Sequence, residues 1–144
     1  MKIIIIEDEA AAYKNIKNLL LQIDPHIEIL DHFDTVVDSV TWLRSHPMPD
    51  LIFMDIQLAD GNSFNIFECV IIEVPIIFTT AYDQYAIKAF EVNSVDYLLK
   101  PITLESMRKA LDKYNRLNPV TVRQHISRIC LLYTSPSPRD PKTS

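Results

Sequence analysis

The sequence predicts an α/β fold: a doubly wound, five-stranded parallel sheet with helices on both faces. Short apolar runs alternate with segments of helical periodicity along residues 1–117, and turn signals fall between them. Five strand–helix units in series require a parallel sheet, because each return to the same edge needs a crossover helix. Since such crossovers are right-handed, we expect helices on both faces of an open sheet.

The predicted strands are short runs of apolar and β-branched residues. The first and third runs are continuously apolar, as expected of strands that are buried on both faces. The second run contains Glu28, Asp31 and His32, which are typical of an edge strand. In chain order, the strands are predicted at residues 3–6, 27–33, 51–54, 76–79 and 95–99.

Apolar residues at three- and four-residue spacing predict the helices between these strands. Pro25 ends the first helix, Asp34 or Thr35 caps the second, Pro47 ends it, and Thr103 caps the last. The fourth helix is short and weakly apolar. The stripes, in chain order, are Tyr13, Ile16, Leu19, Leu20 and Ile23; Val36, Val40 and Leu43; Phe64, Phe67, Val70 and Ile71; Tyr85, Ala86, Ala89 and Phe90; Leu104, Met107, Leu111 and Tyr114.

Composition excludes several classes of function. Gly61 is the only glycine in 144 residues, which excludes the glycine-rich phosphate loops of P-loop and dinucleotide-binding proteins. A net charge of −5 argues against nucleic acid or an anionic membrane as the direct partner of this domain. Cys69 and Cys130 match no zinc-binding spacing. Because no signal-peptide layout and no apolar stretch of ~20 residues is present, we expect a soluble, cytoplasmic protein without a membrane partner.

Acidic side chains follow two strands of the predicted sheet. Glu7 and Asp8 come directly after the first strand, and Asp55 comes directly after the third. In a doubly wound sheet these two strands are neighbours, so the three carboxylates converge at one end. Carboxylates so close repel one another, and a hard divalent cation relieves the repulsion. The sequence therefore predicts a Mg²⁺ site, since Mg²⁺ prefers one or two carboxylates together with waters and phosphate oxygens.

Two further strand ends carry groups that suit a phosphoryl oxygen. Thr80 ends the fourth strand with a hydroxyl, and Lys100 ends the fifth with a mobile positive charge. Taken singly, Asp8 could be a helix cap, Lys100 a solvated lysine and Thr80 a hydroxyl bonded to backbone. Together with Asp55 as a carboxylate nucleophile, the set predicts phosphoryl transfer without a glycine loop.

The order Glu7-Asp8, Asp55, Thr80-Ala81 and Lys100-Pro101 resembles the receiver domain of bacterial two-component response regulators. The segments DIQLADGNSF and IIFTTAYDQYAIKAFEVNSVDYLLKPI more narrowly resemble the receivers of the LytTR class of transcriptional regulators. The resemblance implies a flavodoxin-like (βα)₅ fold with strand order 2-1-3-4-5. It also implies that a sensor histidine kinase is the partner that phosphorylates Asp55, in a phosphorelay.

The same resemblance assigns roles to the residues of the site. Asp8 and Asp55 would bind Mg²⁺ directly, the backbone carbonyl of Gln57 would be a third ligand, and Glu7 would act mainly through water. Lys100 would pair with the phosphoryl group, and the Lys100–Pro101 peptide bond would be cis.

The resemblance also implies a two-state switch. Thr80 would move toward the phosphoryl group and Tyr97 would rotate inward. The face that changes would be formed by the fourth helix, fifth strand and fifth helix, and the phosphorylated form would be a homodimer. Such a domain catalyses its own phosphorylation and slow dephosphorylation but is used up in each cycle, so we do not expect an enzyme.

We expect the receiver domain to span residues 1–117. Residues 118–144 then form a linker and tail, because proline, serine and charged residues dominate them. The final YTSPSPRDPKTS resembles translated vector sequence, so the tail is expected to be partly non-native. The LytTR DNA-binding domain, through which transcription and any DNA contact would be controlled, is absent from these 144 residues.

Two other functions remain open from the residues alone. An aspartate-dependent phosphohydrolase would place a carboxylic general acid two residues after the nucleophile, where this chain has Gln57. A nucleotide- or flavin-binding module of the same architecture would place glycine in its strand-to-helix loops, and only the loop around Gly61 contains one. Both alternatives therefore fit the sequence less well than a phosphoacceptor.

Overall fold

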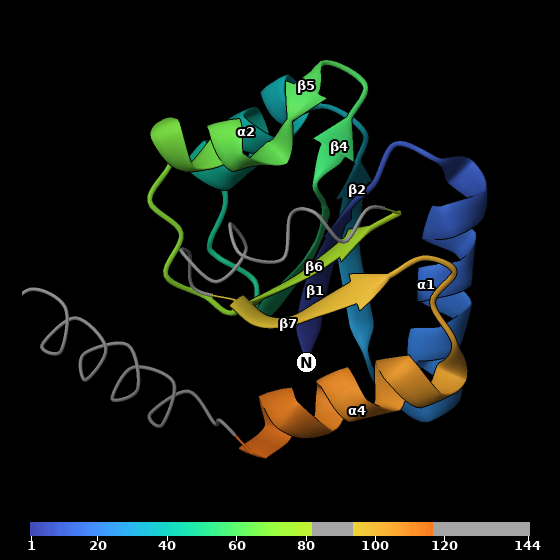
Figure 1. Cartoon of the computed structure of the whole chain (residues 1–144). Coiled ribbons are helices and arrows are strands. Elements are labelled where there is room, and N and C mark those ends of the chain that lie inside the picture. The colour runs from blue at the N-terminus through green and yellow to red at the C-terminus, as the bar shows by residue number, and fades with distance from the viewer. Residues whose placement is uncertain (82–93, 117–144) are drawn as a thin grey trace, which may run out of the picture.

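The computed structural model describes residues 1–81 and 94–116 of the chain. Its centre is a five-stranded parallel sheet in the order β2-β1-β3-β6-β7 (Figure 1). The order confirms the predicted 2-1-3-4-5 arrangement, because β4 and β5 form a separate small hairpin. The sheet strands are β1 (Lys2–Ile6), β2 (Glu28–Phe33), β3 (Leu51–Asp55), β6 (Ile76–Thr80) and β7 (Ser94–Leu99).

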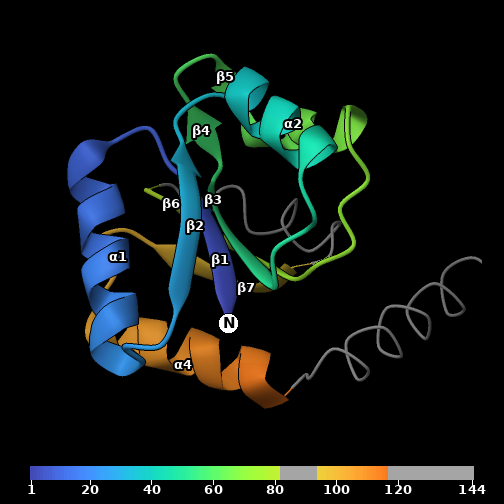
Figure 2. The same ribbon diagram turned by 180° about the vertical axis from the view of Figure 1, so that it is seen from behind.

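Helices cover both faces of this sheet, as Figures 1 and 2 show from opposite sides. One face carries α1 (Ala10–Ile23) and α4 (Leu104–Arg116), and the other carries α2 (Val36–Ser45) and the 3₁₀ helix η1 (Ser63–Glu68). The described residues contain no helix that is long and apolar enough to span a membrane.

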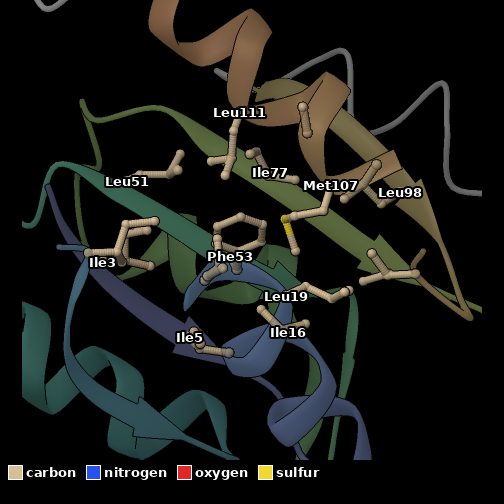
Figure 3. Close-up of a cluster of buried hydrophobic side chains, with 14 residues drawn as sticks. Ile3, Ile5, Ile16, Leu19, Leu51, Phe53, Ile77, Leu98, Met107 and Leu111 are labelled. Atoms are coloured by element: carbon tan, nitrogen blue, oxygen red, sulfur yellow. The ribbon is translucent and has the colours of Figure 1, made fainter. Parts of the chain in front are cut away.

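Each inner strand contributes to two separate cores. Ile3 and Ile5 of β1 face α1 and α4, and Ile4 and Ile6 face α2 and η1, because side chains alternate along a strand. Phe53 of β3 lies at the centre of the first cluster, between Met107 of α4 and the helix α1 (Figure 3). All four isoleucines are fully buried. Burial on both faces is therefore the reason for the continuous apolar run.

The predicted third helix is wrong. Phe64 and Phe67 lie in η1, which ends at Glu68, and Ile71 is 80% exposed. A 3₁₀ helix has three residues per turn, so side chains three apart stand on one side. Both phenylalanine rings pack near Phe78 of β6, with ring centroids 5.2 and 6.4 Å from it. The three-residue spacing thus produces one short 3₁₀ segment and not an α-helical stripe.

The turn predicted around Gly61 lies in a hairpin formed by β4 (Gln57–Leu58) and β5 (Gly61–Asn62). Gly61 has φ = 145°, a conformation that residues with a Cβ rarely adopt. Asp60 in the same hairpin accepts hydrogen bonds from the amides of Val36 and Val37, at 2.6 and 3.2 Å. The hairpin therefore supplies an anion to the N-terminus of α2, where the free amides and the helix dipole favour it.

Side-chain caps also set the starts of α2 and α4. Thr35 Oγ1 accepts a hydrogen bond from the amide of Asp38 at 3.0 Å, so Thr35 and not Asp34 is the cap. Thr103 Oγ1 accepts from the amide of Ser106 at 3.1 Å, as predicted. The predicted fourth helix around residues 85–90 and the predicted tail, residues 118–144, lie outside the described residues.

Candidate functional site

The carboxyl ends of the sheet strands bring together the side chains that the sequence singled out. A cleft of about 200 Å³ opens there, between the loop after β1 and the ends of β3, β6 and β7. Its lining consists of Asp8, Glu9, Asp55, Gln57, Thr80, Ala81 and Lys100. Residues from four strand ends thus surround one small open cleft, as expected of a parallel α/β sheet.

The ammonium group of Lys100 is the centre of this site. Its Nζ donates hydrogen bonds to Glu7 Oε2 at 3.0 Å, to Glu9 Oε1 at 3.0 Å and to Asp55 Oδ2 at 2.9 Å. These are charge-assisted bonds, which are stronger than neutral ones. The Lys100 side chain is only 16% exposed, so water screens its contacts with Glu7 and Asp55 little.

Glu7 is the most deeply buried acid of the group. Its side chain has no exposed surface, and its Oε2 also accepts a hydrogen bond from the amide of Glu9 at 3.1 Å. Its Oε1 lies 2.9 Å from Lys100 Nζ but makes no hydrogen bond to any described residue. A buried carboxylate oxygen with spare acceptor capacity is a group that a cation or an ordered water would satisfy.

Backbone bonds fix the other strand ends. The amide of Gln57 donates to Asp55 Oδ1 at 3.2 Å, which orients the aspartate side chain at the end of β3. The amide of Lys100 donates to the carbonyl of Thr80 at 2.8 Å, which joins the ends of β6 and β7. Thr80 is buried and lines the cleft. The Lys100–Pro101 peptide bond is cis, as the resemblance implied.

The electrostatics of the site reflect the crowding of acids. Burial of the carboxyl group, together with a hydrogen bond to Asp55, raises the pKa of Glu7 to about 8, and Lys100 offsets part of this rise. Burial and the charge of Asp55 also raise the pKa of Asp8. Burial alone would lower the pKa of Lys100, but its hydrogen bonds to Glu7 and Asp55 outweigh burial and raise it.

The donor set fits a divalent cation. Glu7, Asp8 and Asp55 each offer a carboxylate oxygen, and these oxygens lie within 4.8 Å of one another. Hard oxygen donors at this separation suit Mg²⁺, which also keeps several waters. Three acids with one shared lysine leave a net negative charge, so a bound cation would reduce the repulsion that raises the pKa of Glu7 and Asp8.

Tyr97 lies away from this cleft lining. It belongs to the edge strand β7 and packs, partly buried, against the core on the α2 side of the sheet. The predicted switch residues therefore differ in position: Thr80 lines the cleft and Tyr97 lies on the strand beside it, opposite Phe78 in register.

Sequence reasoning missed one residue that lines the cleft, Glu9, and one that lies beside it, His32. Glu9 contacts Lys100 directly, and its signal was the run of three acids after the first strand. His32, on β2, places Nε2 3.1 Å from the carbonyl of Glu7 and stacks on Tyr13 with ring centroids 3.8 Å apart. No sequence signal distinguishes His32, because the contact depends on the register between β1 and β2.

Comparison with known proteins identifies the family. The chain matches the response regulator receiver domain over residues 3–112. It is 40% identical over 119 residues to the sensory transduction protein LytT of Bacillus anthracis, covering 81% of this chain and 48% of LytT. It is 36% identical over 129 residues to the transcriptional regulatory protein BtsR of Salmonella typhi, covering 88% of this chain and 52% of BtsR.

A solved structure agrees with these sequence relatives. The response regulatory domain of protein mrkE from Klebsiella pneumoniae superimposes with a TM-score of 0.68 at 32% identity, covering 86% of this chain and 99% of that chain.

The chain therefore belongs to the response regulator receiver domain family, whose members are signalling domains and not classical enzymes. Membership implies a phosphorelay role with a histidine kinase as partner, and receivers generally bind Mg²⁺ through an acidic cluster such as Glu7, Asp8 and Asp55. The chain spans about half the length of the curated relatives it matches.

Proposed function

We propose that Asp55 is the phosphoacceptor of this receiver and takes its phosphoryl group from a sensor histidine kinase. The observation that carries the proposal is the convergence of Asp55, Lys100 and Thr80, from three different strand ends, on one cleft. Asp55 is 5% exposed and held by the amide of Gln57, so its carboxylate is oriented before any donor arrives.

In the proposed step, a carboxylate oxygen of Asp55 attacks the phosphorus atom of the donor. The oxygen–phosphorus bond forms while the bond from phosphorus to the donor's leaving atom breaks, and the leaving group departs with the electron pair. Lys100 pairs with one phosphoryl oxygen, and the hydroxyl of Thr80 donates to another. No second residue is needed as a nucleophile or a general acid.

The metal site of the proposal consists of Asp8, Asp55 and the backbone carbonyl of Gln57, with Glu7 acting through water. Bound Mg²⁺ would supply positive charge for the phosphoryl oxygens and for the crowded carboxylates. Glu7 and Asp55 share the ammonium of Lys100, so the chain itself already provides part of this positive charge.

Phosphorylation of Asp55 would change the structure at the β7 edge of the sheet. Thr80 would move toward the phosphoryl group and Tyr97 would turn inward, which alters the surface of β7 and α4. The predicted fourth helix of this face lies outside the described residues. The hydrogen bond from the Lys100 amide to the Thr80 carbonyl supports this coupling, because it joins the cleft to β7. We expect the phosphorylated protein to form a homodimer.

The receiver in this proposal spans residues 1–117, and residues 118–144 are a linker and a partly non-native tail. Transcription would be controlled through a LytTR DNA-binding domain outside these 144 residues, in the cytoplasm. The match of residues 3–112 to the receiver family and the names of the LytT and BtsR relatives support this reading.

The test is a mass measurement. Incubation with acetyl phosphate and Mg²⁺ should add one phosphoryl mass to the intact protein, and Asp55→Asn should prevent the addition. Asp50→Asn is the matched control, because Asp50 precedes the same strand at its opposite end. A wild-type protein that stays unmodified would contradict the proposal, as would an adduct that persists in Asp55→Asn.

A further inference from the structure

The ammonium group of Lys100 has no spare donor in this structure. A lysine ammonium carries three N–H groups. Glu7, Glu9 and Asp55 accept one hydrogen bond each, at 3.0, 3.0 and 2.9 Å. While Asp55 is still a carboxylate, a phosphoryl oxygen of an incoming donor that binds Lys100 must therefore replace one of these three hydrogen bonds.

The burial of the three carboxylates decides which of them leaves at least cost. The side chains of Glu7 and Asp55 are 0% and 7% exposed, whereas that of Glu9 is 64% exposed. Before the oxygen–phosphorus bond forms, loss of the ammonium would leave Asp55 as an uncompensated buried charge and the buried carboxyl group of Glu7 without its hydrogen-bond partner. Glu9 would instead regain water, and an exposed ion pair contributes little net free energy.

The conformation of Glu9 points the same way. Glu9 is the N-cap residue of α1, with φ = −99° and ψ = 121°, yet its side chain makes no capping hydrogen bond. Ser, Thr, Asp and Asn are the residues that ordinarily bond an amide of the first helical turn from this position, and the longer glutamate side chain is not committed to that role. The Glu9 carboxylate reaches Lys100 instead, a residue 91 positions away, and lines the cleft.

We propose that Glu9 is the exchangeable ligand of Lys100: it holds the ammonium group in the unphosphorylated receiver and yields it to the phosphoryl group. This inference rests on the proposed phosphorylation of Asp55. The exchange moves no proton and no electron pair, since Glu9 gives up only a hydrogen bond. Its carboxylate competes with the phosphoryl group of the incoming donor for Lys100 and repels that anion, so Glu9 slows phosphorylation.

Two variants of Glu9 test the exchange. Glu9→Gln removes the charge and keeps the shape, and Glu9→Ser removes the charge while supplying a residue that caps α1 well. The matched control is Glu28→Gln, which makes the same charge change at the exposed start of β2, the opposite end of the sheet. At saturating Mg²⁺, both Glu9 variants should gain the acetyl phosphate adduct about two- to fivefold faster than wild type. The control should match wild type.

A second readout needs neither metal nor phosphoryl donor. The ¹⁵N resonance of the Lys100 ammonium group, identified by its loss in Lys100→Arg, should shift in metal-free Glu9→Gln and stay unchanged in Glu28→Gln. Raising the salt concentration should also reduce the rate difference between wild type and Glu9→Gln, because Glu9 is exposed to screening ions.

The outcomes separate this inference from the proposed function. If wild type gains no adduct, the phosphorylation of Asp55 itself fails. If wild type gains the adduct but both Glu9 variants react at the wild-type rate or more slowly, the exchange is overturned and the phosphoacceptor role stands. An unshifted Lys100 resonance in Glu9→Gln would overturn the exchange independently of any reaction.

Discussion

The ammonium group of Lys100 lies 2.9 Å from Oδ2 of Asp55, although 45 positions separate the two residues in the chain. Their strands are not neighbours, since β6 lies between β3 and β7. The long lysine side chain spans that strand and also reaches Glu7 and Glu9. The Lys100 ammonium therefore connects the loop after β1 with the ends of β3 and β7. Its removal should affect the stability of the fold as well as phosphoryl transfer.

Lys100→Met should lower the free energy of unfolding of the metal-free protein by about 3 kcal/mol at pH 8, because it leaves buried carboxylates without a counter-charge. At pH 5 the loss should be smaller, since Glu7, with its pKa of about 8, then carries a proton. Chemical denaturation in EDTA measures both values. Lys100→Arg is the control that keeps the charge, and a Met variant as stable as wild type at pH 8 would refute the expectation.

Glu7 should make the stability of the metal-free protein depend on pH. Its pKa of about 8 in the folded state exceeds the ordinary value of 4.5, so the folded protein binds the proton more tightly. The contribution is fully present below pH 4.5 and is lost as the pH rises through 8. Across that range, Glu7→Gln should gain at most about 5 kcal/mol relative to wild type, as measured by urea denaturation. A difference that does not vary with pH would show that Glu7 does not titrate in this way.

Mg²⁺ should stabilise the folded protein through the acidic cluster. At one hundred times its dissociation constant, a ligand that binds only the folded state adds about 2.7 kcal/mol. The gain should be larger at pH 8 than at pH 6, because the cation competes with the proton on Glu7. Thermal melting with and without Mg²⁺ measures it, and Asp8→Asn should remove most of the gain. An equal gain in Asp8→Asn would place the cation elsewhere.

Asp60→Ala should lower the free energy of unfolding by about 1 kcal/mol, since it removes the acceptor for the amides of Val36 and Val37. Hydrogen bonds from these amides lower the pKa of Asp60. The contribution of Asp60 is therefore present above its ordinary pKa of 3.8 and is lost as the pH falls further. Asp60→Asn keeps one acceptor and should recover part of the loss. No change in Asp60→Ala at neutral pH would mean that Thr35 alone caps α2.

The strands of the sheet could be predicted from the sequence because the inner strands are continuously apolar. The run from Ile3 to Ile6 is apolar on both faces and the second run is polar enough to be an edge, and the structure confirms both positions. The full strand order came from the resemblance to receiver domains. The spacing of apolar residues did not predict the correct type of helix after β5. Phe64 and Phe67 are compatible with an α-helix or with a 3₁₀ turn, and the packing of both rings near Phe78 decides between them.

The site was predictable where a polar residue directly follows an apolar strand. Asp55, Thr80 and Lys100 follow apolar runs, so their convergence follows from the topology alone. The run of three acids placed Glu9 near the site, but its contact with Lys100 could not be predicted, because an exposed acid at a helix start is ordinarily solvated. The contact between His32 and the carbonyl of Glu7 depends on a register shift between β1 and β2, which no local pattern records.

The hydrogen bond from the amide of Lys100 to the carbonyl of Thr80 joins the carboxyl ends of β7 and β6, so the two ends are expected to move together. β7 is bounded by β6 on one side and has no other partner among the described strands. On one side, β6 and β7 are continued by the strands β3, β1 and β2. On the other side, no described strand supports β7. If Asp55 is phosphorylated as proposed, the structural change is expected to reach the β7 edge of the sheet, where Tyr97 lies.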